Sequence, residues 1–264
     1  MARLPAIFLG HGSPMYALEP NKYTEVWSQL SARLPTQPTA ILAISAHWVT
    51  RGIWLTAMEN PPTIHDFRGF PEDLFQIQYP VPGSIALAER VRDLLFSTTQ
   101  HITLEESEWG LDHGTWSVLK YMFPKADIPV VQMSLDATLS EQDHLDLAEK
   151  LIPLRDEGIL IISSGNVVHN LEQITWGNHA LPAPWAIEFN NFFKAQLRLE
   201  TLDSLVHWKD ADHGARLSIP TPEHYWPAIY TLGLKQNYEK ITLITDGIEM
   251  SSISMLSFAV GQLN

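Results

Sequence analysis

Five of the eleven histidines stand in segments where an imidazole could do chemistry: His11, His47, His113, His169 and His224. A neutral imidazole nitrogen is a common ligand of divalent transition metals. A set of histidine and carboxylate ligands that leaves metal positions open is used by non-haem Fe(II) oxygenases. The sequence therefore indicates a candidate metal site, to which either Glu223 or His224 could supply the third ligand.

The absence of cysteine narrows the chemistry further. A chain without cysteine has no disulfides, no thiolate metal ligands and no cysteine nucleophile, so any metal must be bound by His, Asp or Glu. Ser13 is not part of a G-x-S-x-G motif, and Pro14 directly after it would prevent the turn that a serine nucleophile needs. The sequence also lacks both common glycine-rich nucleotide-binding motifs.

The charge of the chain argues against nucleic acid as a partner. There are 17 basic and 30 acidic side chains, for a formal net charge of -13, whereas phosphate binding needs clustered Lys and Arg. No apolar window approaches the roughly 20 residues of a membrane-spanning helix, and the N-terminal segment does not resemble a secretory signal. We expect a cytoplasmic protein without a membrane partner. No pattern indicates its oligomeric state.

Apolar runs alternate with helical patterns, and these elements must position the histidines. The runs are typical of strands buried on both faces of a sheet, and they are Ala6–Leu9, Ala40–Ile44, Pro129–Met133, Gly158–Ile162 and Ile241–Ile244. Helical patterns lie at Pro82–Leu95, Gln142–Leu154 and Trp185–Leu199. The alternation predicts an α/β fold with a mostly parallel or mixed central sheet flanked by helices. Without repeats or low-complexity tracts, one domain is the simplest organisation.

Three of the histidines come soon after predicted strands: His11, His47 and His169. In an open α/β sheet, ligands bind outside the carboxyl ends of the strands. We therefore expect these histidines to converge at one edge of the sheet. The aromatic-rich segments Glu59–Tyr79 and Thr175–Pro184 are expected to be ordered loops that act as lids or pocket walls.

Five further histidines have contexts that point to no chemistry. Helical or polar loop surroundings predict surface positions for His144, His179, His207 and His213, and His101 is expected in an ordinary loop.

Seven segments together resemble the LigB-type class III extradiol ring-cleaving dioxygenases, and most closely the DOPA-cleaving group of that family. They are FLGHGSP, SAHW, PPTIHDFRGFP, WGLDHGTW, SSGNVVHNL, IPTPEHY and DGIEMSSIS, and they span nearly the whole chain. The resemblance implies a single catalytic α/β domain over residues 1–264 and one mononuclear divalent metal. In that family Fe(II) is the catalytically competent ion, and Zn(II) can occupy the same ligands.

The resemblance also implies roles for the matching residues. His11 and His47 match the two metal-ligating histidines of the family. Many LigB-type relatives have Glu as the third ligand, whereas the DOPA-cleaving group has His, so the resemblance favours His224 over Glu223. His169 matches the family's acid/base histidine.

The implied reaction is cleavage of a catechol ring by O2, with L-DOPA converted to 4,5-seco-DOPA, the precursor of betalamic acid. His113 matches a second pocket histidine that contacts the substrate or the oxygen ligand. An amino acid substrate needs partners for its ammonium and carboxylate groups. The loop that carries both charges beside an aromatic ring is a candidate wall, formed by His65, Asp66, Phe67 and Arg68.

Two other classes of protein fit the same residues. A zinc-dependent hydrolase could use the three ligands to generate a metal-bound hydroxide. A non-catalytic metal-binding protein could retain the fold without the chemistry, because function belongs to the site and not to the fold. The presence of both His113 and His169 beside a set of three ligands favours catalysis.

Overall fold

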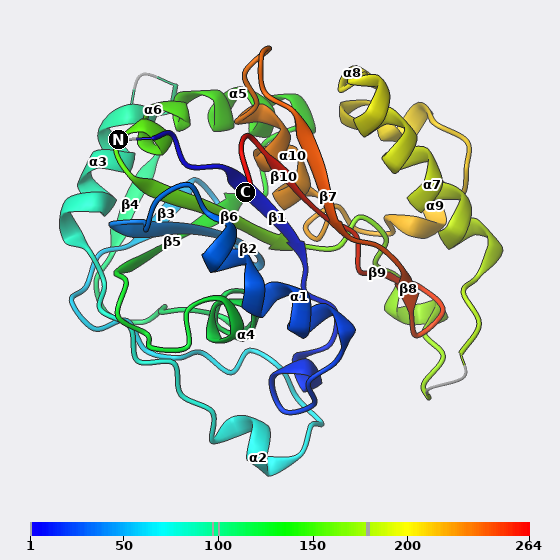
Figure 1. The fold of residues 1–264 in the computed structure, drawn as a ribbon, viewed down its shortest axis with the longest axis horizontal. Helices are drawn as coiled ribbons and strands as arrows, with labels where there is room; N and C mark the ends of the chain where they lie inside the picture. Colours follow the sequence, from blue (N-terminus) through cyan, green and yellow to red (C-terminus); the bar gives the residue numbers. More distant parts are fainter. Residues whose placement is uncertain (1, 97, 100, 178–179) are drawn as a thin grey trace.

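A mixed β-sheet runs through the centre of the molecule (Figure 1). The computed structural model describes residues 2–96, 98–99, 101–177 and 180–264. Its main strands are β1 Ala6–Gly10, β2 Ala40–Thr50, β3 Ile53–Thr56, β4 Ile102–Glu105, β5 Val130–Asp136, β6 Ile159–Gly165, β7 Ile241–Thr245 and β10 Ser257–Val260. Within the described residues these form one eight-stranded sheet in the order β4-β3-β5-β2-β6-β1-β10-β7. A separate ribbon pairs β8 Ile248–Glu249 with β9 Ile253–Ser254.

The four central strands are parallel and apolar. Strands β5, β2, β6 and β1 are neighbours in that order, and every residue of β1, β5 and β6 is buried. Burial on both faces explains why these strands are nearly continuous apolar runs. On one side β10 is antiparallel to β1, and β7 is antiparallel to β10. On the other side β3 is antiparallel to β5 and parallel to β4. The predicted α/β class with a mostly parallel, mixed sheet is confirmed.

All five predicted strands are present, but the prediction for Ile241–Ile244 was wrong in one respect. This segment lies in β7 at the edge of the sheet, where its residues are half-buried and not covered on both faces. The sequence did not predict β3, β4 and β10, which have four residues each. So short a segment carries too few residues to show a clear hydrophobic period.

Helices cover both faces of the sheet (Figure 1). They are α1 Lys22–Leu30, α2 Glu72–Phe75, α3 Ile85–Leu95, α4 His113–Met122, α5 Glu141–Lys150, α6 Ile152–Asp156, α7 Pro184–Leu199, α8 Asp203–Val206, α9 Ala215–Ser218 and α10 Trp226–Gly233. Side chains alternate between the two faces along β2. Ile41 and Ala43 belong to the core beneath α1 and α4, whereas Leu42 and Ile44 belong to the core beneath α3, α5 and α10.

The predicted helices are present with shifted bounds. The helix predicted from Pro82 begins at Ile85, because the Ser84 side chain accepts a hydrogen bond from the Leu87 amide and caps the helix there. The helix predicted over Gln142–Leu154 is divided into α5 and α6, and Pro153 stands in the first turn of α6. The helix predicted over Trp185–Leu199 is α7. In the described part of the chain, no helix is long and apolar enough to cross a membrane.

The predicted surface histidines have mixed outcomes. His207 and His213 are exposed, and so is His101 in its loop before β4. The prediction for His144 was wrong: it is fully buried, because its face of α5 packs against α10, where its Nδ1 lies 3.1 Å from the Tyr230 hydroxyl. His179 lies outside the described residues.

A buried arginine forms hydrogen bonds with several chain segments near the N-terminal end of β1. Arg155 in α6 is fully buried and donates from all its N–H groups. Two pairs with the Glu239 carboxylate are 2.6 and 2.8 Å long, and the backbone oxygens of Leu4, Leu234 and Val260 accept the others. The arginine thus joins the segments that lead into β1 and out of β10 and α10.

We expect Glu239→Gln to destabilise the protein by about 3–5 kcal/mol, because it leaves the buried charge of Arg155 without its partner. Burial raises the pKa of the Glu239 carboxyl, but hydrogen bonds from Arg155 and the Gln236 amide outweigh this and lower it. The stabilisation is therefore present above the carboxyl's unfolded pKa and is lost as the pH falls through the lower folded value. Urea unfolding as a function of pH measures both effects.

The matched control is Glu157→Gln, which removes the carboxylate of an exposed pair with Arg90. We expect that change to cost less than about 1 kcal/mol. Equal stability of Glu239→Gln and the wild-type protein would contradict the role of the buried pair.

Candidate metal centre and active site

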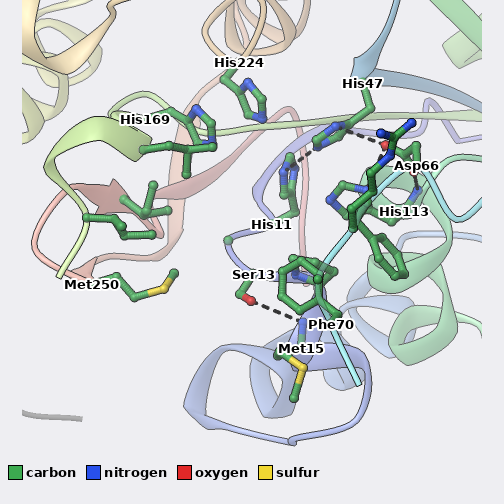
Figure 2. Close-up of a pocket in the computed structure, with 18 of the residues that line it drawn as sticks. His11, Ser13, Met15, His47, Asp66, Phe70, His113, His169, His224 and Met250 are labelled. Atoms are coloured by element: carbon green, nitrogen blue, oxygen red, sulfur yellow. Dashed lines mark hydrogen bonds and ion pairs between the residues drawn. The ribbon is translucent and has the colours of Figure 1, made fainter. Parts of the chain in front are cut away.

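All five histidines singled out from the sequence line one cavity of about 790 Å³ (Figure 2). Elements far apart in the chain supply them. His11 directly follows β1, His113 is the first residue of α4, and His224 stands just before α10. His169 lies beyond β6 and forms an isolated β-bridge with Ile253. The expected convergence at the carboxyl end of the sheet is confirmed.

His47 is positioned by an irregularity within a strand and not by the end of one. Strand β2 continues to Thr50, but its register with β5 shifts between Ile44 and Val49. A bulge of this kind re-aims side chains and is common beside active sites. Gly114 in α4 lies so close that a Cβ atom there would be 2.5 Å from the Ser45 hydroxyl and 3.0 Å from the His47 ring. Only glycine lets α4 approach His47 this closely.

The end of β6 brings His11 and His224 together. The His11 amide donates to the Gly165 carbonyl at 3.2 Å, and the next amide, of Asn166, donates to the His224 carbonyl at 2.8 Å. A Cβ atom on Gly165 would lie 2.3 Å from the His224 oxygen, so this close approach requires glycine. One peptide group of β6 therefore fixes the backbone of two cavity histidines.

Three rings lie at mutual distances that suit one metal ion. The ring centroid of His11 lies 5.0 Å from that of His47 and 5.5 Å from that of His224, and the centroids of His47 and His224 are 4.9 Å apart. The Nε2 atoms of His11 and His47 are 3.2 Å apart. Two imidazole nitrogens that bind one tetrahedral ion at 2.0–2.1 Å are separated by about 3.3 Å. The spacing fits a shared ion.

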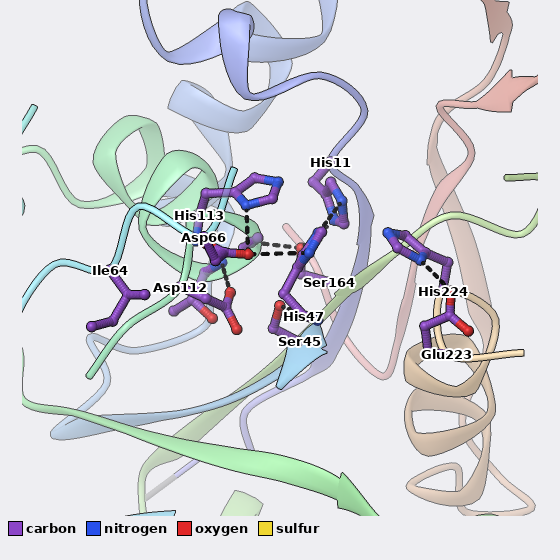
Figure 3. Close-up of polar contacts among 12 residues, drawn as sticks. His11, Ser45, His47, Ile64, Asp66, Asp112, His113, Ser164, Glu223 and His224 are labelled. Carbon is purple, nitrogen blue, oxygen red and sulfur yellow. Dashed lines mark hydrogen bonds and ion pairs between the residues drawn. The ribbon is translucent and has the colours of Figure 1, made fainter. Parts of the chain in front are cut away.

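Hydrogen bonds assign the protons on these rings (Figure 3). The Ser164 hydroxyl donates to the Gly114 carbonyl at 2.6 Å, so toward His11 Nδ1, 2.9 Å away, it acts as the acceptor. His47 Nδ1 lies 3.2 Å from the carboxylate of Asp66, and a carboxylate accepts. In both rings Nδ1 therefore carries the proton, and the Nε2 lone pair is free to bind a metal.

His224 follows the same pattern and adds a further observation. Its Nδ1 lies 3.2 Å from the Glu223 carboxylate, while its Nε2 is buried without a hydrogen-bond partner among the described residues. His224 thus lines the cavity. Glu223 does not line it, and its carboxylate orients the His224 ring through Nδ1. An unpaired buried nitrogen costs free energy, which a bound cation would recover.

Burial keeps these imidazoles neutral. It lowers the pKa of His11, His47 and His224 well below the usual value, and the neighbouring histidines lower it further by charge repulsion. The neutral form is the one that binds metals. The donor set therefore fits a divalent cation.

Two other histidines line the same cavity. His113 Nδ1 lies 2.9 Å from Oδ2 of Asp66, and its amide donates to the other carboxylate oxygen at 2.9 Å. His169 stacks on His224 with ring centroids 3.5 Å apart and planes only 4° from parallel. Burial is the main cause that lowers the pKa of His169 to about 4. Both rings are held beside the candidate metal ligands.

The side-chain atoms allow more than one group of metal ligands. The ligand atoms of His11, His47 and His113 lie within 4.8 Å of one another, and those of His169, Glu223 and His224 form a second group of this kind. The cluster has the donors of a mononuclear metal site. Asp66 holds the Nδ1 of His113 just as Glu223 holds that of His224, so these hydrogen bonds do not distinguish the two rings, and of the two only the His224 Nε2 is buried without a partner among the described residues.

Asp66 orients two histidines at once. Its carboxylate contacts Nδ1 of both His47 and His113 and accepts the His113 amide. Burial raises the pKa of this carboxyl, but the hydrogen bonds from the His113 ring and amide, with the neighbouring imidazoles, outweigh it and hold it at about 2. Asp66 is therefore ionised, and its oxygens are already engaged.

Of the other residues predicted to form a substrate wall, two line the cavity and one does not. Phe67 and Arg68 line the cavity, as predicted for the loop Glu59–Tyr79. His65 does not: its Nε2 lies 2.9 Å from the Ile77 carbonyl and its ring packs on Trp116. From the other predicted loop, Trp176 reaches the cavity.

Sequence reasoning missed several residues of the site. It assigned no orienting role to Ser164, although a serine at the end of an apolar strand is a signal for such a role. It also missed the apolar residues Met15, Leu171, Ile174 and Met250 in the cavity wall. These come from three separate chain segments, and no local pattern predicts that they meet.

Comparisons with known proteins show the family to which the chain belongs. The family model for the catalytic LigB subunit of aromatic ring-opening dioxygenase matches residues 5–260. The 4,5-DOPA dioxygenase extradiol of Escherichia coli K12 is 50% identical over 262 residues, covering 98% of this chain and 95% of that protein. The protein of the same name from Beta vulgaris is 36% identical over 241 residues, covering 90% of this chain and 89% of its own.

A solved structure shows the same fold. The crystal structure of an uncharacterised protein from Escherichia coli K12 has a TM-score of 0.85 and 47% identity, and the match covers 98% of this chain and 100% of that one. The chain therefore belongs to the LigB family of aromatic ring-opening dioxygenases. Within that family it is an extradiol dioxygenase of the type that these relatives represent.

We expect Asp66→Asn to weaken Zn(II) binding by about 10–100-fold, because the amide does not hold the Nδ1 protons of His47 and His113 as a carboxylate does. Competition with a chromophoric chelator measures the affinity without any turnover. Asp93→Asn is the matched control, since Asp93 is exposed and pairs only with its neighbour Arg92 among the described residues. Wild-type affinity in the Asp66 variant would show that this carboxylate does not orient a ligand.

Proposed function

We propose that residues 1–264 act as one catalytic domain that cleaves catechols with O2 at a single divalent metal ion, with L-DOPA as a substrate and 4,5-seco-DOPA as the product. The metal ligands are His11, His47 and His224. The observation that carries this assignment is the His224 Nε2 atom, which is buried without a hydrogen-bond partner among the described residues, on a ring next to His11 and His47, whose own Nε2 atoms lie 3.2 Å apart. The relatives named as 4,5-DOPA dioxygenases support the substrate.

The lone-pair arrangement needs a cation. The Nε2 atoms of His11 and His47 are 3.2 Å apart, and with both protons on Nδ1 neither nitrogen can donate to the other. Two facing lone pairs repel each other, and the buried Nε2 of His224 has no donor among the described residues. A divalent ion held by His11, His47 and His224 would take up these lone pairs.

A bound divalent ion supplies Lewis acidity that lowers the pKa of catechol hydroxyls, and Fe(II) in addition supplies the electrons for oxygen chemistry, whereas Zn(II) in the same ligands supplies only the first. Three neutral imidazoles would hold the ion without reducing its positive charge. Membership of a ring-opening dioxygenase family favours this chemistry over hydrolysis by zinc or metal binding alone.

His169 has the position and charge state of a general base. It is neutral at physiological pH because burial keeps its pKa at about 4. Its backbone is fixed by the amide hydrogen bond to Ser218 and by the bridge to Ile253, so the ring remains stacked beside His224. A ring nitrogen of His169 accepts a proton from a catechol hydroxyl, and it returns that proton when the ring opens.

His113 and the apolar wall complete the active site. The Asp66 carboxylate holds the His113 ring, which meets Phe67 edge-on with centroids 5.4 Å apart. The ring of His113 therefore lies between the metal ligands and the aromatic wall, where it contacts bound substrate. Phe70 and Met250 add apolar surface to the cavity (Figure 2), which excludes water from the reacting groups.

The activity is tested by loading metal-free protein with Fe(II) without oxygen, and then adding L-DOPA and oxygen. We expect oxygen uptake coupled to the appearance of a yellow ring-opened product, and neither signal after loading with Zn(II). No oxygen uptake with L-DOPA or with a panel of simpler catechols would contradict the proposed function.

His169→Ala separates catalysis from metal binding. We expect the variant to bind Zn(II) like the wild-type protein, while ring cleavage by the Fe(II)-loaded variant falls by about 10²–10⁴-fold, the usual contribution of general acid–base catalysis. His207→Ala, which changes an exposed histidine, is the control. Unchanged turnover in the His169 variant would exclude this residue from the mechanism.

A further inference from the structure

We infer that the cavity selects catechols that carry an anionic side chain, that Arg68 binds this anion, and that the site has no partner for an ammonium group. The inference rests on the proposed function and deepens it. It predicts that the substrates form a wider class than catecholic amino acids: catechols with a short chain that ends in a carboxylate.

Arg68 is the sole Arg or Lys among the described residues that line the cavity. It is exposed, and no carboxylate of the described chain lies within ion-pair distance of it, so its charge is available to a ligand. Asp66 and Phe70, which flank it in the loop, both face the cavity (Figure 2). A planar guanidinium binds a carboxylate through two parallel hydrogen bonds.

A substrate ammonium finds no such partner. Asp66 is the one carboxylate among the described cavity-lining residues. One of its oxygens lies 2.9 Å from His113 Nδ1 and 3.2 Å from His47 Nδ1, and the other accepts the His113 amide. An ammonium group that took these oxygens would release both rings. The cavity therefore offers the guanidinium of Arg68, which is unpaired among the described residues, to an anion, whereas the carboxylate of Asp66 is already bound to His47 and His113.

The charge of the whole molecule makes this preference testable. A net charge of -13 attracts cations and repels anions over the surface as a whole. Preference for an anionic substrate must therefore come from a local group, and Arg68 is the group in place. A cationic catechol is attracted by the net negative charge of the protein, but the positive charge of Arg68 repels it at the cavity wall.

The experiment compares kcat/KM of the Fe(II)-loaded enzyme for four catechols: L-DOPA, dihydrocaffeate, dopamine and 4-methylcatechol. Dihydrocaffeate is L-DOPA without its amino group, dopamine is L-DOPA without its carboxylate, and 4-methylcatechol has neither charge. We expect L-DOPA and dihydrocaffeate to be similar, both to exceed 4-methylcatechol, and dopamine not to exceed it.

The variant Arg68→Gln then assigns the selectivity to one side chain. We expect the ratio of kcat/KM for either acid to that for 4-methylcatechol to fall by about 10–100-fold, as for the loss of a hydrogen bond to a charged group. Arg68→Lys should retain part of the ratio, because it keeps the charge but loses the paired geometry. The matched control is Arg198→Gln, which removes an exposed guanidinium from the end of α7, outside the cavity lining.

Three outcomes would overturn the inference. The first is turnover of L-DOPA at least about tenfold better than that of dihydrocaffeate, which would mean that the ammonium is recognised. The second is an equal loss on all four catechols in Arg68→Gln, which would give this arginine a structural role. The third is an unchanged ratio in that variant. Failure of the wild-type enzyme on every catechol, including 4-methylcatechol, would instead contradict the proposed function.

Discussion

The structure of this enzyme depends on one arrangement that is unfavourable without a cation: imidazole lone pairs that face one another in a buried cavity. Ser164, Asp66 and Glu223 each hold a ring by Nδ1, which leaves the Nε2 atoms of His11, His47 and His224 without a proton to donate, and the first two of these atoms lie 3.2 Å apart. Burial keeps the rings neutral, and neutral rings cannot relieve the repulsion by sharing protons. In the proposed site, the fold keeps the rings in this geometry so that they can bind a metal ion.

The sheet supplies the rigidity that this geometry requires. One peptide group at the end of β6 binds the backbone of both His11 and His224, and a bulge in β2 turns His47 toward them. Two close approaches, at Gly114 and Gly165, leave no room for a side chain. Far from the cavity, Arg155 joins the segments next to β1, β10 and α10, so the elements that carry the ligands are also fixed at their other ends.

The sequence predicted the class of fold and the five cavity histidines, because long apolar strands have a clear pattern and strand ends meet at one edge of a sheet. It did not predict contacts that arise only from packing. His144 stands in a polar helical segment, yet α10 covers it. Asp66 looked like a partner for substrate, but the fold brings it to two histidines that lie far away in the sequence. Nor could the sequence show that His224 lines the cavity while the Glu223 carboxylate contacts the Nδ1 of that ring, because adjacent residues point in different directions.

The central claim is that His11, His47 and His224 bind the metal, while His113 and His169 lie beside it. X-ray absorption at the zinc edge counts the imidazole ligands of Zn(II)-loaded protein directly. Our account predicts three imidazoles in the wild-type protein, three in His113→Ala and two in His224→Ala. Loss of an imidazole in His113→Ala with three retained in His224→Ala would contradict it, and would place the ion in the group formed by His11, His47 and His113.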